Sequence, residues 1–345
     1  MKVIRIISKF KNTVFWHIIL TKLIYPFYKI IWLNLINSEG KYLFSEFKKE
    51  NDKNHIIHID EDKPCAIIKN DKTFFDFANK ISKQVDHNLI LKKIEDLNKN
   101  YQTLKNNDYF FSIYEDLNIS IKKEIVEFAK SKRNLSIAAN YLGVMPTISK
   151  ISLYVNFPKD YQKERAAMLW HKDDFGFKSL DFFMPICKLD NDNGAMQFLD
   201  KKNELGVFER VPEHIEDALP KERNKIKTVD FEKYFDEKKI RSFIGDLGDV
   251  LLIDSFRIYH RGGKCKKNYR IMFRISYQTP DSSRVLSHNI DNKFQYLKTL
   301  KKSDMSSKLD KYIFFGNEKY KNKKKFINFL LLFYRLMHVK FKKIT

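Results

Sequence analysis

The spacing of apolar residues divides the chain into a helical stretch followed by a stretch of short strands. Residues 50–135 are mainly polar, with Leu and Ile at helical intervals in runs such as HNLILKKIEDL and ISIKKEIVEFA, which predicts helices. One or two short strands are expected within 56–70. From residue 148, apolar runs alternate with turn sequences such as DNDNG and GDLGD. These runs predict strands at 151–157, 179–189, 195–200, 226–231, 249–254 and 269–279.

Many short strands at this spacing are typical of a β-barrel or β-sandwich, so the predicted fold class is α+β, a barrel with flanking helices. We expect three parts: an apolar, basic N-terminal segment at 1–49, a domain at 50–300 with its barrel core at about 148–280, and a basic amphipathic C-terminal segment at 301–345. The polar stretch 200–225, which contains two prolines, is predicted to be an insertion or loop.

Composition excludes several classes of protein. With 345 residues, 43% of them hydrophobic, the chain is long enough to bury its own core and too apolar to be disordered. Its cysteines, Cys65, Cys187 and Cys265, are far apart in sequence, which argues against a disulfide framework and a cysteine zinc site. A reducing, cytoplasmic location is therefore expected.

The net charge of +22 is concentrated at the two ends of the chain. Residues 1–49 carry a net +7 and residues 319–345 a net +9, each beside an apolar run, at 14–36 and 326–343. We predict that these runs form helices on an anionic membrane surface, on the inner face of the membrane, with packing on the domain as the alternative. A nucleic-acid partner is not expected, because the middle of the chain holds little excess charge.

Two patches carry candidate metal chemistry. His171 and Asp173 are two residues apart in MLWHKDDFG, so on a strand they point to the same side. His260 stands where the apolar strand of GDVLLIDSFRIYH would end. Two imidazoles and one carboxylate form the facial triad that binds Fe(II) and leaves three coordination positions open.

The last predicted strand carries two arginines on one face, Arg270 and Arg274. An arginine that points into a barrel needs an anionic partner, because an unpaired buried charge is costly. That partner is either the carboxylate of a ligand or an Asp or Glu on another strand, and the sequence leaves both alternatives open.

In this order, HKD at 171–173, NDNGAMQFL at 191–199, GDVLLIDSFRIYHRGG at 248–263 and Arg270 resemble the phytanoyl-CoA dioxygenase-like family of Fe(II)/2-oxoglutarate oxygenases. The resemblance covers roughly residues 150–280 and implies a double-stranded β-helix, the cupin-like jelly roll. It also implies His171, Asp173 and His260 as catalytic iron ligands, with Fe(II), 2-oxoglutarate and O2 as cofactor and co-substrates. Arg270 would bind the far carboxylate of 2-oxoglutarate, with Arg274 as the alternative, and Tyr154 would help to hold it.

The implied function is hydroxylation of a small-molecule, lipid or glycan-linked substrate at the membrane surface. Asp173 favours hydroxylation, because related halogenases have a small residue in its place. The chain departs from the family pattern after residue 199, where DKKNE replaces the usual P-G-S-H turn, so the substrate stays open. The sequence does not determine the oligomeric state. The alternative function is that of a non-catalytic, cupin-like ligand-binding barrel.

Overall fold

The computed structural model describes the central part of the chain. The described residues are 37–50, 57–60, 64–99, 110–158, 166–173, 178–199, 225–226, 231, 239–280, 305 and 307–316. The two predicted membrane-facing runs and all but the last residue of the polar stretch 200–225 lie outside them. Within these described ranges, no helix has the length and apolar character needed to cross a membrane.

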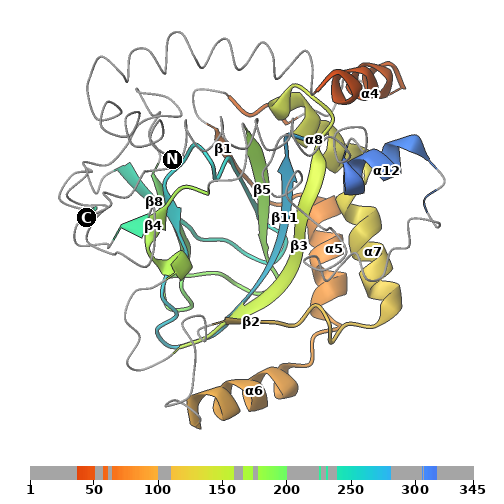
Figure 1. The fold of residues 1–345 in the computed structure, drawn as a ribbon. Coiled ribbons are helices and arrows are strands. Elements are labelled where there is room, and N and C mark those ends of the chain that lie inside the picture. The colour runs from red at the N-terminus through yellow and green to blue at the C-terminus, as the bar shows by residue number, and fades with distance from the viewer. Residues whose placement is uncertain are drawn as a thin grey trace, which may run out of the picture.

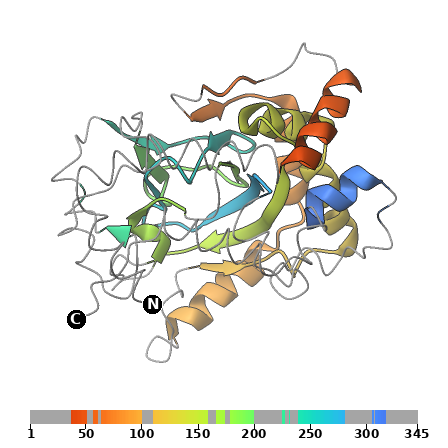
Figure 2. The same ribbon diagram turned by 45° about the horizontal axis from the view of Figure 1, so that its top comes forward.

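In the described part of the chain, eleven strands form two antiparallel sheets, which we call the large and the small sheet (Figures 1 and 2). The large sheet has the order β1-β9-β5-β11-β3-β2, and the small sheet the order β7-β4-β10-β6-β8. The large-sheet strands are β1 (Cys65–Ile68), β2 (Phe110–Ser112), β3 (Thr147–Asn156), β5 (Ser179–Pro185), β9 (Val250–Ile253) and β11 (Arg270–Gln278). The small-sheet strands are β4 (Trp170–His171), β6 (Met196–Leu199), β7 (Lys225–Ile226), β8 (Ile240–Phe243) and β10 (His260–Arg261).

From β3 to β6, and again from β8 to β11, each strand lies in the other sheet from the strand before it. Strands β3, β5, β9 and β11 lie in the large sheet, and the small sheet holds β4, β6, β7, β8 and β10. This alternation is the topology of a double-stranded β-helix, so the predicted fold class is confirmed. The sheets face each other as two separate layers and do not close into the continuous barrel that we expected.

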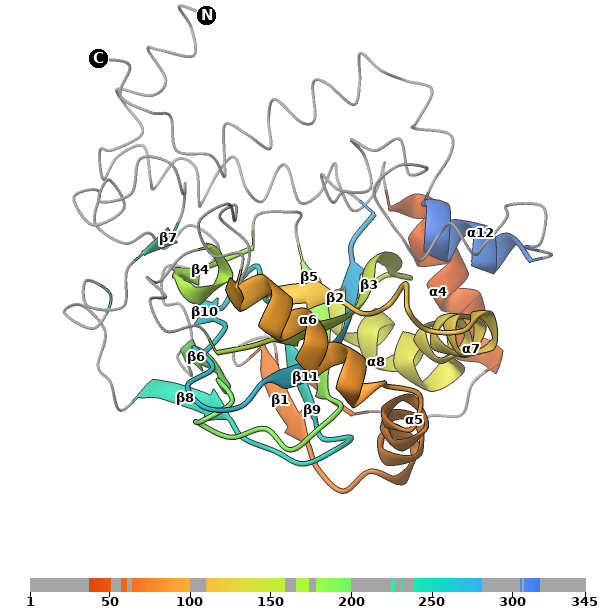
Figure 3. The same cartoon turned by 90° about the horizontal axis from the view of Figure 1, so that it is seen from below.

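Helices cover the outer face of the large sheet (Figure 1). They are α4 (Ser38–Glu50), α5 (Lys72–Ser82), α7 (Ile119–Ala129), α8 (Lys132–Leu142) and α12 (Lys308–Phe315). Helix α6 (His87–Lys99) lies apart from them, beside β2 (Figure 3), where Nζ of Lys93 is 5.8 Å from the ring centre of Phe111. A 3-10 turn, η5 (Ala166–Met168), leads into β4.

The inner strands β5 and β9 of the large sheet are buried on both faces, which explains why their sequences are mostly apolar. Phe182 and Phe273 point outward into the helix layer, where Phe74 of α5 packs edge-on against Phe182 with ring centres 6.4 Å apart. Their neighbours Phe183 and Met272 point inward and pack against the small sheet. Because side chains alternate along a strand, those of β5 and β11 pack in turn against the helices and against the small sheet.

Local capping sets the ends of the helices. The Asp71 side chain accepts hydrogen bonds from the backbone N–H groups of Thr73 and Phe74 and so begins α5, and Asn118 does the same for α7. Gly143, with φ of 73°, ends α8 in the left-handed conformation and turns the chain toward β3.

Candidate metal centre

The small sheet brings His171 and His260 together. The two residues are direct partners in the antiparallel pair formed by β4 and β10, and their ring centres are 4.4 Å apart. Both residues are buried, at 9% and 4% exposure. Strand β10 also pairs with β6, so His260 is held from both sides by backbone hydrogen bonds.

Backbone carbonyls orient the two imidazole rings. Nδ1 of His171 lies 2.7 Å from the carbonyl oxygen of Leu169, and Nδ1 of His260 lies 3.1 Å from that of Ile258. A carbonyl can only accept, so each Nδ1 carries the proton and donates it. A neutral imidazole with its proton on Nδ1 offers the lone pair of Nε2, which is the form in which histidine binds a metal ion.

Asp173 completes the cluster. Its backbone N–H donates to the carbonyl oxygen of Ser255 at 2.9 Å, which ties the residue to the turn that precedes β10. Its Oδ1 lies 3.7 Å from Nε2 of His171. One donor atom from each of His171, Asp173 and His260 lies within 4.8 Å of the others, so the three predicted ligands meet in one place. This donor set fits an octahedral divalent ion with open positions.

Arg274 is held by two carboxylates. Its Nε and Nη2 donate to the two oxygens of Asp181 at 3.1 and 3.0 Å, and Nη2 also donates to Oδ2 of Asp173 at 2.8 Å. Burial lowers the pKa of the Arg274 guanidinium, but Asp181 and Asp173 outweigh that effect and raise the pKa above its usual range. Arg274 thus has the protein carboxylate partner that we considered for an inward arginine.

Arg270 has a different environment. It is 4% exposed, and its Nε donates to Oδ1 of Asn156 on the neighbouring strand at 3.1 Å. Its Nη1 is buried and has no hydrogen-bond partner among the described residues. A buried guanidinium with an unused donor is the local condition for binding an anion.

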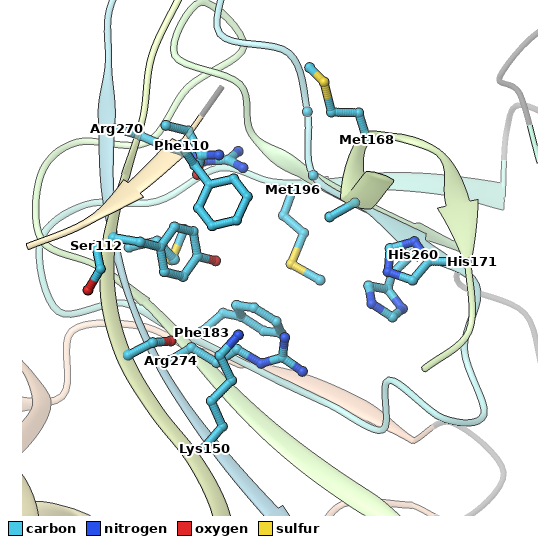
Figure 4. A pocket seen from close by; sticks show the side chains of 17 residues that line it. Phe110, Ser112, Lys150, Met168, His171, Phe183, Met196, His260, Arg270 and Arg274 are labelled. Atoms are coloured by element: carbon cyan, nitrogen blue, oxygen red, sulfur yellow. The ribbon is translucent and has the colours of Figure 1, made fainter. Parts of the chain in front are cut away.

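A cavity of about 290 Å³ connects these groups (Figure 4). Arg270 and the two histidines lie on opposite sides of it, with Met196 between them, and Arg274 extends toward the histidines. Tyr154 also lines the cavity, and burial raises the pKa of its phenol, so the hydroxyl keeps its proton. All six predicted site residues except Asp173 are in the cavity lining, and Asp173 reaches the site through its contacts with His171 and Arg274.

Sequence reasoning missed several residues of the site. Asp181 is wholly buried and pairs with Arg274, yet it lies within the apolar run SLDFFMP. A lone acid in such a run is a signal for a buried cationic partner. Lys150 and Met196 line the cavity without a sequence signal that we could identify.

No family model and no curated protein matches the chain. Solved structures to which the chain has a distant similarity include SnoK, a non-heme alpha ketoglutarate dependent carbocyclase from nogalamycin biosynthesis, with 12% identity over 72% of this chain and 86% of SnoK, at a TM-score of 0.38. EctD from S. alaskensis, solved with 2-oxoglutarate and 5-hydroxyectoine, has 12% identity over 64% of this chain and 73% of EctD, at 0.38. AviO1 from Streptomyces viridochromogenes Tue57 has 12% identity over 64% of this chain and 91% of AviO1, at 0.37. At such low similarity, the function rests on the residues of this chain.

Proposed function

We propose that this protein is an Fe(II)- and 2-oxoglutarate-dependent oxygenase whose metal ligands are His171, Asp173 and His260. The observation that carries the proposal is the convergence of two oriented imidazoles and one carboxylate beside the cavity that Arg270 also lines. Neutral imidazole nitrogens and a single carboxylate oxygen are the ligands of non-heme Fe(II) oxygenases. Such a triad leaves room on the metal for a chelating co-substrate and dioxygen.

Arg270 is the residue that we assign to the far carboxylate of 2-oxoglutarate. Its unused Nη1 and its neighbour Nη2 form a planar fork, which matches a carboxylate better than it matches any neutral ligand. Asn156 fixes the guanidinium from its Nε side. Tyr154 keeps its phenolic proton and lines the same cavity, where it can donate a hydrogen bond to the co-substrate.

With iron and 2-oxoglutarate bound, the centre would supply oxidation of a C–H bond by O2, with 2-oxoglutarate converted to succinate and CO2. The chain itself would orient the co-substrate between Arg270 and the histidines, and the lining between them includes the apolar side chains of Met196, Met272 and Phe183. Asp173 fills the third ligand position, which favours hydroxylation as the reaction.

The proposed substrate is a small molecule, lipid or glycan-linked compound met at an anionic membrane surface. The support is the sequence, in which net charges of +7 and +9 accompany the apolar runs near the two ends. Binding of the full chain to vesicles with and without anionic lipid tests this setting. Binding that needs the anionic lipid and weakens with added salt supports it, and no binding contradicts it.

Succinate formation tests the proposed reaction. The full chain, supplied with Fe(II), 2-oxoglutarate and O2, is expected to form succinate slowly even without its substrate, and an added cell extract that contains the substrate should accelerate it. The His260→Ala variant should form none. A wild-type protein that binds Fe(II) and 2-oxoglutarate but forms no succinate under any of these conditions would be a ligand-binding barrel, the alternative function.

A further inference from the structure

The large sheet fixes the orientation of the Arg274 guanidinium, and this orientation determines how Arg274 contacts Asp173. In the pairing of β11 with β5, Phe183 lies directly opposite Arg274, and the guanidinium carbon is 4.9 Å from the centre of the Phe183 ring. Asp181 lies opposite Ser276, one diagonal step from Arg274, which allows the two-pronged ion pair. A planar guanidinium with a carboxylate fork at its edge and a ring against its face has a single orientation.

With Arg274 in this orientation, the two oxygens of Asp173 have different neighbours. Oδ2 accepts from Nη2 of Arg274, whereas Oδ1 is the oxygen beside Nε2 of His171. As long as Arg274 occupies Oδ2, only Oδ1 is directed at the position shared by the three ligands. Coordination through one oxygen leaves three positions open on an octahedral ion, and coordination through both oxygens would leave two.

Asp181 also balances the positive charge of Arg274. A cation that contacts a metal ligand competes with the metal for the negative charge of that ligand. Arg274 is such a cation, at 2.8 Å from Asp173, but Asp181 contributes an equal and opposite charge. Since Arg274 and Asp181 together are neutral, Asp173 keeps its charge for a divalent ion.

We infer that Arg274 and Asp181 form a positioning pair for the metal centre. Arg274 fixes Asp173 so that it offers one oxygen, and Asp181 offsets the charge of Arg274 so that this oxygen still attracts a cation. The inference rests on the proposed function, because it assumes that His171, Asp173 and His260 hold a metal ion. It makes Arg274 a residue that acts through Asp173, and it leaves the co-substrate carboxylate to Arg270.

The test is the affinity of the full chain for Mn²⁺, measured from the electron paramagnetic resonance signal of the free ion. The Asp181→Asn variant keeps the shape of the side chain and removes its charge, so Arg274 then opposes Asp173 alone. We expect Mn²⁺ affinity to fall about tenfold or more. The double variant Asp181→Asn with Arg274→Gln removes both charges, and we expect affinity to return to within about threefold of the wild type.

The recovery distinguishes this role from a merely structural one, which predicts that the double variant binds no better than the single variant. The control is Asp71→Asn, the same change in the Arg133–Asp71 ion pair at the start of α5, which should leave Mn²⁺ affinity unchanged. If Asp181→Asn does not fold, the double variant still decides, because removing both partners of a buried pair is tolerated better than removing one. A folded double variant that binds Mn²⁺ more than tenfold more weakly than the wild type would overturn the inference.

Failure of the inference and failure of the proposed function give different results. A wild-type chain that does not bind Mn²⁺ at all contradicts the metal centre itself. A wild-type chain that binds Mn²⁺, together with an Asp181→Asn variant that binds it equally well, contradicts the positioning pair alone.

Discussion

His171 and His260 stand opposite each other across β4 and β10, each a strand of two residues, with ring centres 4.4 Å apart. A metal ion bound by both rings would therefore link the two strands as well as serve chemistry. Because an ion that binds only the folded state stabilises it, a concentration of about 100 times Kd should add about 2.7 kcal/mol to the free energy of unfolding. Thermal unfolding with and without Mn²⁺ measures this, and the melting temperature should rise.

The same experiment on ligand variants locates the site. His260→Ala should weaken Mn²⁺ binding by about 100-fold or more, since even changes to residues behind a ligand cost about 10- to 100-fold. In this variant, Mn²⁺ should no longer raise the melting temperature. His58→Ala is the matched control, because His58 is an exposed histidine outside the sheets, and the shift should be kept. An equal shift in both variants would place the ion elsewhere.

Arg270→Lys tests the assignment of the co-substrate carboxylate. Lysine keeps the charge but loses the planar fork, so the affinity for 2-oxoglutarate should fall about 10- to 100-fold, as expected for the loss of a charge-assisted hydrogen bond. Calorimetric titration of the Mn²⁺-loaded protein measures this affinity. Mn²⁺ affinity should be unchanged. If 2-oxoglutarate binds the variant as well as the wild type, another group holds its carboxylate.

Gly262 leaves space for Arg270. A Cβ atom at position 262 would lie 3.1 Å from Nη2 of Arg270, closer than side chains normally pack. We expect Gly262→Ala to shift the guanidinium and to weaken 2-oxoglutarate binding about three- to tenfold, because a side chain forced off its preferred rotamer costs roughly 0.5–1.5 kcal/mol. Mn²⁺ binding serves as the internal control and should not change. A variant with normal 2-oxoglutarate affinity would show that Arg270 has room to move.

Asp254 should make stability depend on pH. Its carboxyl group is wholly buried, accepts hydrogen bonds from Tyr141 at 2.7 Å and Ser179 at 3.1 Å, and has a raised pKa, chiefly because of burial. Between the unfolded pKa of about 3.9 and this raised value, the folded chain keeps a proton that the unfolded chain has lost. Stability contributed by this group is therefore complete below about pH 4 and is lost as pH rises, by at most about 1.4 kcal/mol per pH unit.

Asp254→Asn removes this titration. Urea unfolding of the metal-free wild type and variant between about pH 4 and pH 7 should show the wild type losing stability relative to the variant as pH rises. The ligand histidines are present in both proteins, so their contribution cancels in the difference. Asp76→Asn, at an exposed acid, is the control and should run parallel to the wild type. Parallel curves for Asp254→Asn as well would show that its pKa is not raised.

The long strands could be predicted from the sequence, whereas the short ones that carry the site could not. Strands β3, β5 and β11 have seven to ten residues each, many of them β-branched or aromatic, so composition is enough to reveal them. Strands β4 and β10 are two residues each, so no periodicity exists within them, and only the H-x-D spacing and the position of His260 pointed to the site. The pairing of β4 with β10 depends on the register between strands that are far apart in the sequence, and a single sequence does not reveal that register.

The different roles of Arg270 and Arg274 could not be predicted from the sequence either. Arg270 and Arg274 share a face of β11, and both were candidates for the co-substrate carboxylate. What separates them is the side chain that each one contacts on a neighbouring strand, the amide of Asn156 for Arg270 and the carboxylate of Asp181 for Arg274. Those partners follow from the pairing of β11 with β3 and β5, and one sequence does not contain that information.

Anaerobic titration of the Fe(II)-loaded protein with 2-oxoglutarate tests the central claim most directly. A 2-keto acid that chelates Fe(II) produces a visible charge-transfer absorption, so the titration reports metal and co-substrate at one site. We expect this absorption to appear in the wild type and to saturate at one 2-oxoglutarate per iron. It should be absent in His260→Ala and should need a higher 2-oxoglutarate concentration in Arg270→Lys. A wild-type protein that binds Fe(II) without developing the absorption, or that does not bind Fe(II), would contradict the account.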